Sequence, residues 1–262
     1  MKIVVCAKQV PDTTEVKLDP KTNTLIRDGV PSIMNPDDKA GIEAALQLKE
    51  KVGGTVTVVS MGPPQADAAL REALAMGCDE AILVTDRAFG GADTWATSST
   101  IAAALKKLDY DVIITGRQAI DGDTAQVGPQ IAEHLGIPQV SYAEELTADG
   151  DSLIVKRQFE DRYQKIRVKT PCLITALSEI AEPRYMTVGG TIDAYAKEIK
   201  VLGFEELKDK LNPEHIGLKG SPTNVVKSFT KQAKGAGEVL KDASADDAVK
   251  AIIAKMEEKH II

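Results

Sequence analysis

Residues 116–130 combine small, acidic and hydroxyl-bearing side chains in a pattern suited to holding a phosphorylated ligand. The segment opens as Gly-Arg-Gln-Ala-Ile-Asp, and we predict that it leads into a helix ending near Leu135. Small residues let the backbone approach a phosphate closely, and free N–H groups at a helix start can hold an anion. Asp121 and Asp123 would repel phosphate, so we expect them to cap the turn or to accept hydrogen bonds from ribose hydroxyls. An Asp/Gly turn followed by an ordinary helix cap is the alternative.

Three other segments could contribute to the same kind of site. Residues 35–38, Asn-Pro-Asp-Asp, precede a long predicted helix, and their acids could equally be simple helix caps. Residues 61–64, Met-Gly-Pro-Pro, could line an adenine pocket or merely form a turn. Residues 90–99, Gly-Gly-Ala-Asp-Thr-Trp-Ala-Thr-Ser-Ser, bring glycines and threonines to a helix start. They are a second candidate phosphate cradle, or an ordinary N-cap.

Sequence signals of several other chemistries are absent. The chain contains no G-x-G-x-x-G, Walker A, G-x-S-x-G or H-E-x-x-H pattern. Its three histidines are widely separated, so the sequence predicts no zinc site. No nucleophile can be paired with a base, which argues against a self-contained hydrolase or kinase.

Charge and hydropathy argue against a nucleic-acid-binding or membrane protein. The net charge is −7 with acids and bases mixed along the chain, so no concentrated basic face is expected. No apolar run approaches the roughly 20 residues that span a bilayer, and the amino terminus is charged too early for a secretory signal. Cys6, Cys78 and Cys172 lie far apart, which predicts reduced thiols and a cytoplasmic location.

The first half of the chain alternates predicted strands with predicted helices. Short β-branched runs predict strands, whereas apolar residues spaced three and four apart predict helices. The predicted strands are residues 2–6, 55–60, 80–84 and 111–115, and the predicted helices are 38–52, 65–76 and 97–108. This alternation predicts an α/β fold with a doubly wound, mainly parallel sheet. Ligands of such sheets bind beyond the carboxyl ends of the strands, where three of the four segments above begin.

After Pro138 the pattern changes to strands with little helix between them. Asp149-Gly150 predicts a hairpin turn, and the last apolar run could return to the core of the sheet. We therefore expect antiparallel strands to extend the parallel sheet. The predicted strands are residues 139–145, 152–158, 164–170 and 172–177.

The tail differs from the rest of the chain. From about Ser221 it is polar and lysine-rich, and it ends in an amphipathic helix that begins near Ser244. We therefore divide the chain into an α/β nucleotide-binding domain, residues 1–220, and a linker with a terminal helix, residues 221–262. The apolar face of this helix packs either on its own domain or on a partner subunit. That face comprises Val249, Ile252, Ile253 and Met256.

Several segments, in their order and spacing, resemble the β (small) subunit of electron-transfer flavoproteins along nearly the whole chain. Each segment is a weak signal alone, but their combination in one chain of this length is specific. They are Ala7-Lys8-Gln9-Val10-Pro11, Asn35-Pro36, Ala73-Leu74-Ala75-Met76-Gly77, Gly116-Arg-Gln-Ala-Ile-Asp121 and Glu182-Pro183-Arg184-Tyr185. The resemblance implies a heterodimeric electron carrier that works with an α subunit.

The resemblance also implies a nucleotide site. In the simple branch of that family the ligand is AMP with a structural role, and in the electron-bifurcating branch it is FAD. The implied cofactor-binding residues are Ala7, Asn35, Pro36, Asp37, Asp38, Met61, Ala119, Ile120, Asp121, Gly122, Asp123, Thr124, Ala125, Gln126, Val127, Gly128, Pro129 and Gln130.

Residues 90–99 resemble an insertion typical of the bifurcating branch, and Asp38 matches its preference for an acid. We expect Asp93, Thr94 and Thr97 to add to the cradle, because FAD has a pyrophosphate that AMP lacks. The resemblance then implies that FAD takes a hydride from NADH. One electron would pass to ferredoxin or flavodoxin, and the other, through the α-subunit FAD, to an acyl-CoA dehydrogenase. The flavin carries this chemistry, so we nominate no catalytic side chain.

Residues 180–186 resemble the partner-recognition loop of the family. Ile180 would place an apolar anchor in a dehydrogenase pocket, with polar residues around it. From the residues alone, a strand-ending turn fixed by proline is the alternative. The implied contact residues are Ile180, Glu182, Pro183, Arg184 and Tyr185.

Two other functions fit the same sequence. A non-bifurcating carrier with AMP shares every feature except residues 90–99 and Asp38. A stand-alone ATP-binding protein, or an ATP-pyrophosphatase of the adenine nucleotide α-hydrolase-like fold, could also be built on this architecture. Such a pyrophosphatase normally has a serine- and glycine-rich loop after its first strand, where this chain has Ala7–Pro11.

Overall fold

The computed structural model describes residues 1–12, 31–226, 235, 237, 239–241 and 243–262. These residues fall into two units, Met1–Val225 and Val226–Ile262. The linker predicted from residue 221 extends into residues 227–234, which lie outside the described residues. The division of the chain at residue 220 therefore remains a prediction.

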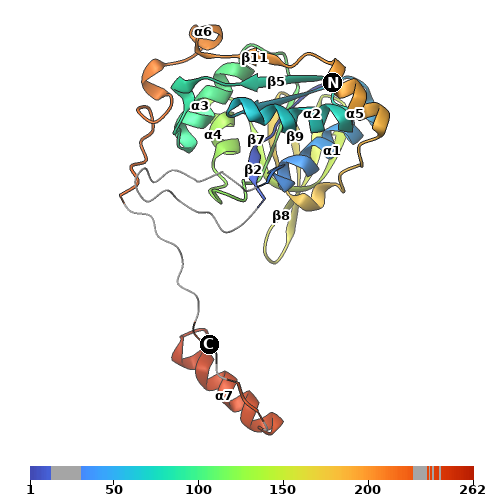
Figure 1. The fold of residues 1–262 in the computed structure, drawn as a ribbon. Helices are drawn as coiled ribbons and strands as arrows, with labels where there is room; N and C mark the ends of the chain where they lie inside the picture. The colour runs from blue at the N-terminus through green and yellow to red at the C-terminus, as the bar shows by residue number, and fades with distance from the viewer. Residues whose placement is uncertain (13–30, 227–234, 236, 238, 242) are drawn as a thin grey trace. The chain divides into compact units, whose positions relative to one another are not determined.

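The first unit is built on a nine-stranded sheet (Figure 1). Along the sheet the strand order is β11-β5-β4-β1-β6-β10-β7-β8-β9, and every pairing from β11 to β7 is parallel. Strands β8 and β9 add on by antiparallel pairing. The strands are β1 (Lys2–Cys6), β4 (Thr55–Met61), β5 (Glu80–Val84), β6 (Val112–Gly116), β7 (Gln139–Asp149), β8 (Ser152–Gln158), β9 (Tyr163–Lys169), β10 (Cys172–Ala176) and β11 (Lys200–Leu202). The predicted mainly parallel sheet with antiparallel strands is confirmed.

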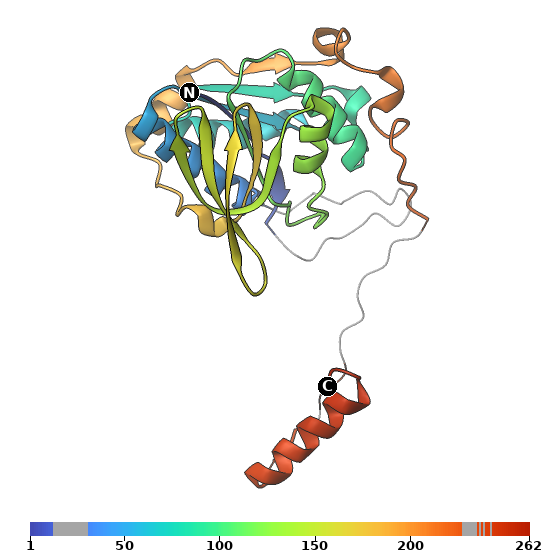
Figure 2. The same cartoon turned by 180° about the vertical axis from the view of Figure 1, so that it is seen from behind.

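Helices cover both faces of this sheet (Figures 1 and 2). Helices α1 (Pro36–Val52) and α2 (Asp67–Met76) share one apolar cluster with the sheet, and α3 (Thr94–Leu105) and α4 (Val127–Leu135) share another. Successive strand residues supply the two clusters in turn, as Val4 and Val5 do in β1. Because both faces are buried, the central strands are continuous apolar runs instead of alternating ones.

Strand β7 carries the antiparallel strands back over the α1 side of the sheet. Its pairing with both neighbours shifts register near Ala143, and Tyr142 has a φ of 58°, which is rare for a bulky residue. A hairpin with Gly150 at a φ of 62° then joins β7 to β8. Leu153 and Val168, on β8 and β9, are buried in the same cluster as α1. The predicted return of the chain into the sheet core as β10, between β6 and β7, is confirmed.

Several short elements are present that the sequence pattern does not predict. Helix α5 (Val188–Ala196) begins with two glycines after its first residue and buries only Ala194, so its apolar periodicity is weak. The others are β2 (Gln9–Pro11), β3 (Ser32–Met34), β11, α6 (Phe204–Leu207) and the 3₁₀ turns η1 (Pro64–Ala66), η2 (Arg87–Phe89), η3 (Ser178–Ile180) and η4 (Pro213–His215). Elements of three or four residues are too short to show a period.

The second unit contains α7 (Ala245–Glu258). The Ser244 hydroxyl caps this helix by accepting a hydrogen bond from the Asp247 N–H, as its sequence predicts. Val249, Ile252 and Ile253 are exposed on it. No helix within the described ranges is long and apolar enough to cross a membrane.

Candidate functional site

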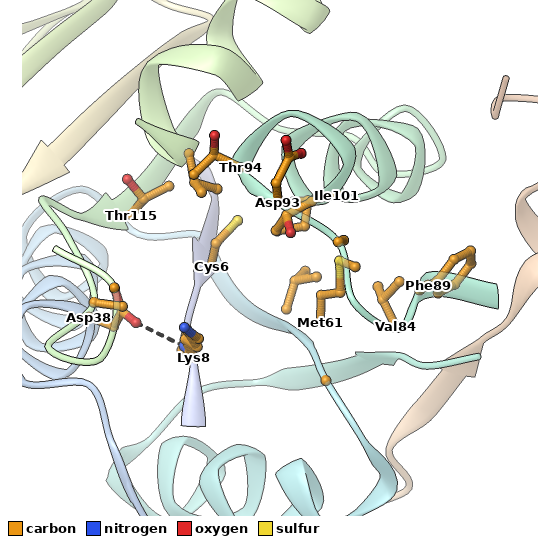
Figure 3. A pocket seen from close by; sticks show the side chains of 18 of the residues that line it. Cys6, Lys8, Asp38, Met61, Val84, Phe89, Asp93, Thr94, Ile101 and Thr115 are labelled. Atoms are coloured by element: carbon orange, nitrogen blue, oxygen red, sulfur yellow. Dashed lines mark hydrogen bonds between the residues drawn. The ribbon is translucent and has the colours of Figure 1, made fainter. Parts of the chain in front are cut away.

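A cavity of about 1280 Å³ opens at the carboxyl ends of the central strands (Figure 3). The chain runs outward from β1 to β4 and β5 on one side and to β6 and β10 on the other, so β1 and β6 mark the topological switch point. Residues that follow β1, β4, β5 and β6 all line the cavity. The site therefore lies where a doubly wound sheet is expected to bind its ligand.

Asp38 joins the ends of the two switch-point strands. One carboxylate oxygen accepts the Lys8 N–H at 2.8 Å, and the other accepts the Gly116 N–H at 2.8 Å. Burial raises the pKa of Asp38 to about 7, although both backbone N–H groups favour the charged form. Asp38, predicted to bind a ligand, lines the cavity. It also fixes the backbone at Lys8 and Gly116, two other residues that line the cavity.

Asn35 positions the loop on the far side of the cavity. Its side chain donates to the Gln118 carbonyl at 2.8 Å and accepts the Ile120 N–H at 3.1 Å. Asp37, also predicted to bind ligand, is buried and forms an ion pair with Arg117 at 3.4 Å. Burial raises the pKa of Asp37, against the opposing effect of Arg117. Asn35 and Asp37 do not line the cavity and instead fix its loop from behind.

Two glycines allow the close approaches on which the site depends. A Cβ at Gly116 would lie 2.2 Å from Asp38 Oδ1, so only glycine lets that carboxylate reach the end of β6. A Cβ at Gly128 would lie 2.6 Å from Thr115 Oγ1 and 2.8 Å from Thr175 Cγ2. Gly128 therefore lets the start of α4 sit directly over β6 and β10.

The loop that ends at α4 is shaped to present backbone N–H groups. Asp123 and Ala125 have φ values of 49° and 52°, and Gln126 returns to the right-handed helical region. Such alternation turns successive N–H groups toward one point and forms an anion-binding concavity. Among the described residues no side chain caps α4, and its first turn has no acid. The predicted phosphate cradle is thus consistent with the observed backbone.

Two cations outside the predicted set of binding residues, Lys8 and Arg117, line the cavity. Lys8 pairs with Asp121 at 2.6 Å, so this acid neutralises a lysine instead of facing a ligand. Arg117 lies beside Asp37, but its buried Nε donates no hydrogen bond to any described residue. Both cations lie just after the carboxyl ends of their strands. Because ligands of such sheets bind beyond these ends, the predicted strand ends would have been enough to nominate both residues.

The opposite wall of the cavity is apolar. Figure 3 shows Met61, Val84 and Phe89 together on one side, across from Asp38 and Lys8. Only Met61 was nominated from the sequence. Val84 ends β5 and Phe89 lies in η2, just before the predicted segment 90–99, and apolar side chains such as these are typical of an ordinary core.

Residues 90–94 and Thr97 of the predicted second cradle, residues 90–99, form another wall of the cavity. The Asp93 carboxylate caps α3 by accepting the Ala96 N–H at 3.0 Å, so this helix starts three residues earlier than predicted. Thr94 donates to Gln126 Oε1 at 2.9 Å and thereby links this wall to the start of α4. Thr97 also lines the cavity.

Most of the nominated residues converge on this one cavity. Those that do not line it are Asn35, Pro36, Asp37, Ile120, Asp121, Pro129 and Gln130. Those that line it are Ala7, Asp38, Met61, Asp93, Thr94, Thr97, Ala119, Gly122, Asp123, Thr124, Ala125, Gln126, Val127 and Gly128. No group of three or more His, Cys, Asp or Glu within the described ranges could hold a metal ion.

Residues 22–206 match the electron transfer flavoprotein domain. The chain belongs to this family. It is 59% identical to the electron transfer flavoprotein subunit beta of Clostridium acetobutylicum, over the full length of both chains. It is also 54% identical to the caffeyl-CoA reductase-Etf complex subunit CarD of Acetobacterium woodii and 50% identical to the acryloyl-CoA reductase electron transfer subunit gamma of Anaerotignum propionicum, again over the full length of both chains. This electron transfer flavoprotein β subunit is a partner of an α subunit.

The β subunit carries a second region of interest in the predicted recognition loop. Arg184 is turned inward, where its guanidinium contacts Glu43 at 2.8 Å and Glu50 at 2.7 Å on α1. Ile180 is partly buried against the core, whereas Tyr185 is 97% exposed. The exposed apolar side chains continue along α5 with Val188, Ile192 and Tyr195. The most exposed apolar side chains of this region therefore lie after Pro183.

Proposed function

We propose that this chain is the β subunit of an electron-bifurcating flavoprotein and that its cavity holds FAD. FAD bound there would supply two-electron acceptance of hydride from NADH and release of single electrons. One electron would pass to ferredoxin or flavodoxin, and the other, through the α-subunit FAD, to an acyl-CoA dehydrogenase. The donor, both routes and the assignment of FAD over AMP belong to this proposal.

The size of the cavity carries the proposal. Its volume of about 1280 Å³ exceeds the roughly 300–1,000 Å³ that is usual for small-molecule sites. It continues from Asp38 and the loop before α4 to the wall at Gly90–Thr97. A mononucleotide would leave much of this space unfilled. A dinucleotide is long enough to contact both the loop before α4 and the wall at the start of α3.

The residues present suit the parts of FAD. Backbone N–H groups at 124–128 suit a pyrophosphate, because this loop alternates between left- and right-handed backbone conformations. The wall of Met61, Val84 and Phe89 suits a flat ring system. Thr94 and Thr97 add hydroxyl groups at the far end.

The names of two relatives support the choice of partner. They assign those proteins to a caffeyl-CoA reductase complex and to an acryloyl-CoA reductase. Both names describe reduction of a CoA thioester, the chemistry expected of a partner in the acyl-CoA dehydrogenase class. We place the partner contact at residues 180–186, extended by the exposed face of α5.

The terminal helix is proposed to dock on the α subunit. Its apolar residues Val249, Ile252 and Ile253 are exposed, and burying apolar area of this kind favours association. Replacing Ile252 and Ile253 by serine should weaken heterodimer formation, which analytical ultracentrifugation would measure. An unchanged dissociation constant would place the helix elsewhere.

Flavin stoichiometry tests the main proposal. The heterodimer should be co-expressed with its α subunit, denatured and analysed for FAD and AMP by chromatography. Two FAD per heterodimer are expected. One FAD and one AMP would leave the alternative, a simple carrier with a structural nucleotide at the polar end of the cavity.

Variants of α3 test where the dinucleotide lies. Thr94→Val and Thr97→Val keep side-chain shape but remove hydroxyls that line the cavity, and we expect β-site FAD affinity to fall about three- to tenfold. Thr100→Val is the matched control, because Thr100 lies on the same helix and donates to the Ala96 carbonyl away from the cavity. Equal FAD occupancy in all three variants would mean that the dinucleotide does not reach the α3 hydroxyls.

A further inference from the structure

Residues 217–223, which we call the strap, cross the start of α3 from a distant part of the chain. The Leu218 N–H donates to the Gly90 carbonyl at 3.0 Å, and the Leu218 side chain packs on Gly91. Ser221 Oγ accepts the Asp93 N–H at 2.9 Å. The Thr223 N–H donates to Asp93 Oδ2 at 2.9 Å. The strap thus contacts the wall of the cavity from outside.

Asp93 has both carboxylate oxygens engaged by backbone N–H groups. Oδ1 caps α3 through Ala96, and Oδ2 holds the strap through Thr223. One side chain therefore fixes the start of the helix and ties it to a segment about 130 positions away. Direct contact with a phosphate would place two negative charges together, so Asp93 is better suited to positioning than to ligand binding.

The neighbours of Asp93 connect the strap to the other side of the cavity. Thr94 donates to Gln126, just before α4. Trp95 lies edge-on to His134 of α4, at 4.7 Å between ring centroids, and to His215 at 5.9 Å. His215 lies two residues before the strap in sequence. Contacts therefore run from the strap through Asp93–Trp95 to α4.

We infer that the strap sets the position of the α3 wall and so controls how tightly the β-site cofactor is retained. Asp93, Ser221 and Thr223 are positioning residues in this arrangement, and Thr94 and Thr97 are the groups they position. The inference rests on the proposed function for the identity of the cofactor.

Two substitutions separate the strap contact from the rest of the wall. Asp93→Asn keeps a good N-cap residue but replaces one of the two acceptors by an amide N–H₂ group. Ser221→Ala removes the acceptor of the Asp93 N–H, and Ser221 does not line the cavity. Thr187→Ala is the control, because this hydroxyl also accepts a backbone N–H, from Gly190, but at the start of α5.

The heterodimer, stripped of nucleotide, should be titrated separately with FAD and AMP. We expect Asp93→Asn to raise the Kd for the β-site cofactor about tenfold and Ser221→Ala about threefold, with faster release. Thr187→Ala should retain the wild-type Kd. Trp95 fluorescence, obtained by subtracting the emission of a Trp95→Phe heterodimer, should shift in Asp93→Asn and Ser221→Ala but not in Thr187→Ala. A general loss of stability would not produce this difference between the variants.

Wild-type Kd and unshifted Trp95 emission in Ser221→Ala and in folded Asp93→Asn would overturn the inference. If Asp93→Asn fails to fold, Ser221→Ala decides alone. If the wild-type heterodimer contains one FAD and one AMP, the proposed function fails, and the AMP titration then tests the strap by the same criteria.

Discussion

At the cavity, Asp37 and Asp38 are buried, and Asp38 accepts the N–H groups of Lys8, which follows β1, and of Gly116, which ends β6. At the recognition loop, the charged side chain of Arg184 is held against α1, and Tyr185 is left 97% exposed. Buried polar groups that are fully hydrogen-bonded make a rigid site. Exposed apolar side chains on a pinned backbone instead form a surface suited to a partner.

Helix α1 serves both regions. Its first turn places Asp38 at the cavity and Asp37 behind it, and Glu43 and Glu50, seven residues apart, lie on one side of the helix and bind Arg184. Burial raises the pKa of Glu43, but the hydrogen bonds and charge of Arg184 outweigh this and hold the pKa below its ordinary value. Substitutions along one helix should therefore affect the two regions separately.

The largest effect is expected from Gly116→Ala. The new Cβ would lie 2.2 Å from Asp38 Oδ1, so the carboxylate or the end of β6 must move. We expect a loss of about 3 kcal/mol in the free energy of unfolding, measured by urea denaturation, and loss of the β-site cofactor. Gly122→Ala is the matched control, because a Cβ there meets no described atom within 4 Å. Equal stability of the two variants would show that Asp38 is not held as described.

Asp38→Asn should have the next largest effect. An amide has one acceptor, so the Lys8 or the Gly116 N–H is left unpaired, at a cost of about 2 kcal/mol in the free energy of unfolding.

The pH dependence of this cost identifies the cause. With a folded pKa of about 7 and an unfolded value of 3.8, folded Asp38 keeps its proton at pH values where the unfolded chain has lost it. The wild type should therefore lose stability relative to Asp38→Asn as pH rises from about 4 to about 7. A pH-independent difference in urea denaturation would mean that Asp38 is ionised throughout.

Glu43→Gln should act at the recognition loop and leave the cavity intact. Glu43 makes two contacts with the Arg184 guanidinium and accepts its backbone N–H, so a neutral amide releases the loop. We expect the KM of an acyl-CoA dehydrogenase for the reduced heterodimer to rise about tenfold, since preorganisation lowers the entropic cost of docking. Flavin content should stay the same. Loss of flavin instead would contradict the independence of the two regions.

Glu50→Gln gives the smallest expected effect. Glu50 is more exposed than Glu43 and contacts only one nitrogen of Arg184, at 2.7 Å. Exposed ion pairs contribute little, so the same KM should rise by about twofold. An effect larger than that of Glu43→Gln would show that the outer contact, and not the buried one, holds the loop.

Local sequence signals predicted the main sheet and its helices well. β-branched runs such as 112–115 and helical spacing such as that of α1 reflect burial, which recurs at fixed intervals along the chain. Helix α5 was not predicted because it buries a single residue. The apolar wall at Val84 and Phe89 was not nominated because its side chains match those of an ordinary core.

The sequence by itself determined the α/β alternation, the resemblance to the β subunit and the segments that meet at the cavity. Only the tertiary structure decided which way the charged groups face. Arg184 was expected to meet a partner and binds α1, and Asp121 was expected at the ligand and pairs with Lys8. These contacts join residues more than 100 positions apart, and no local period records such pairings. Asp93 is the clearest case. Its sequence position predicts that it caps a helix, but no local pattern predicts that it accepts the Thr223 N–H of the strap.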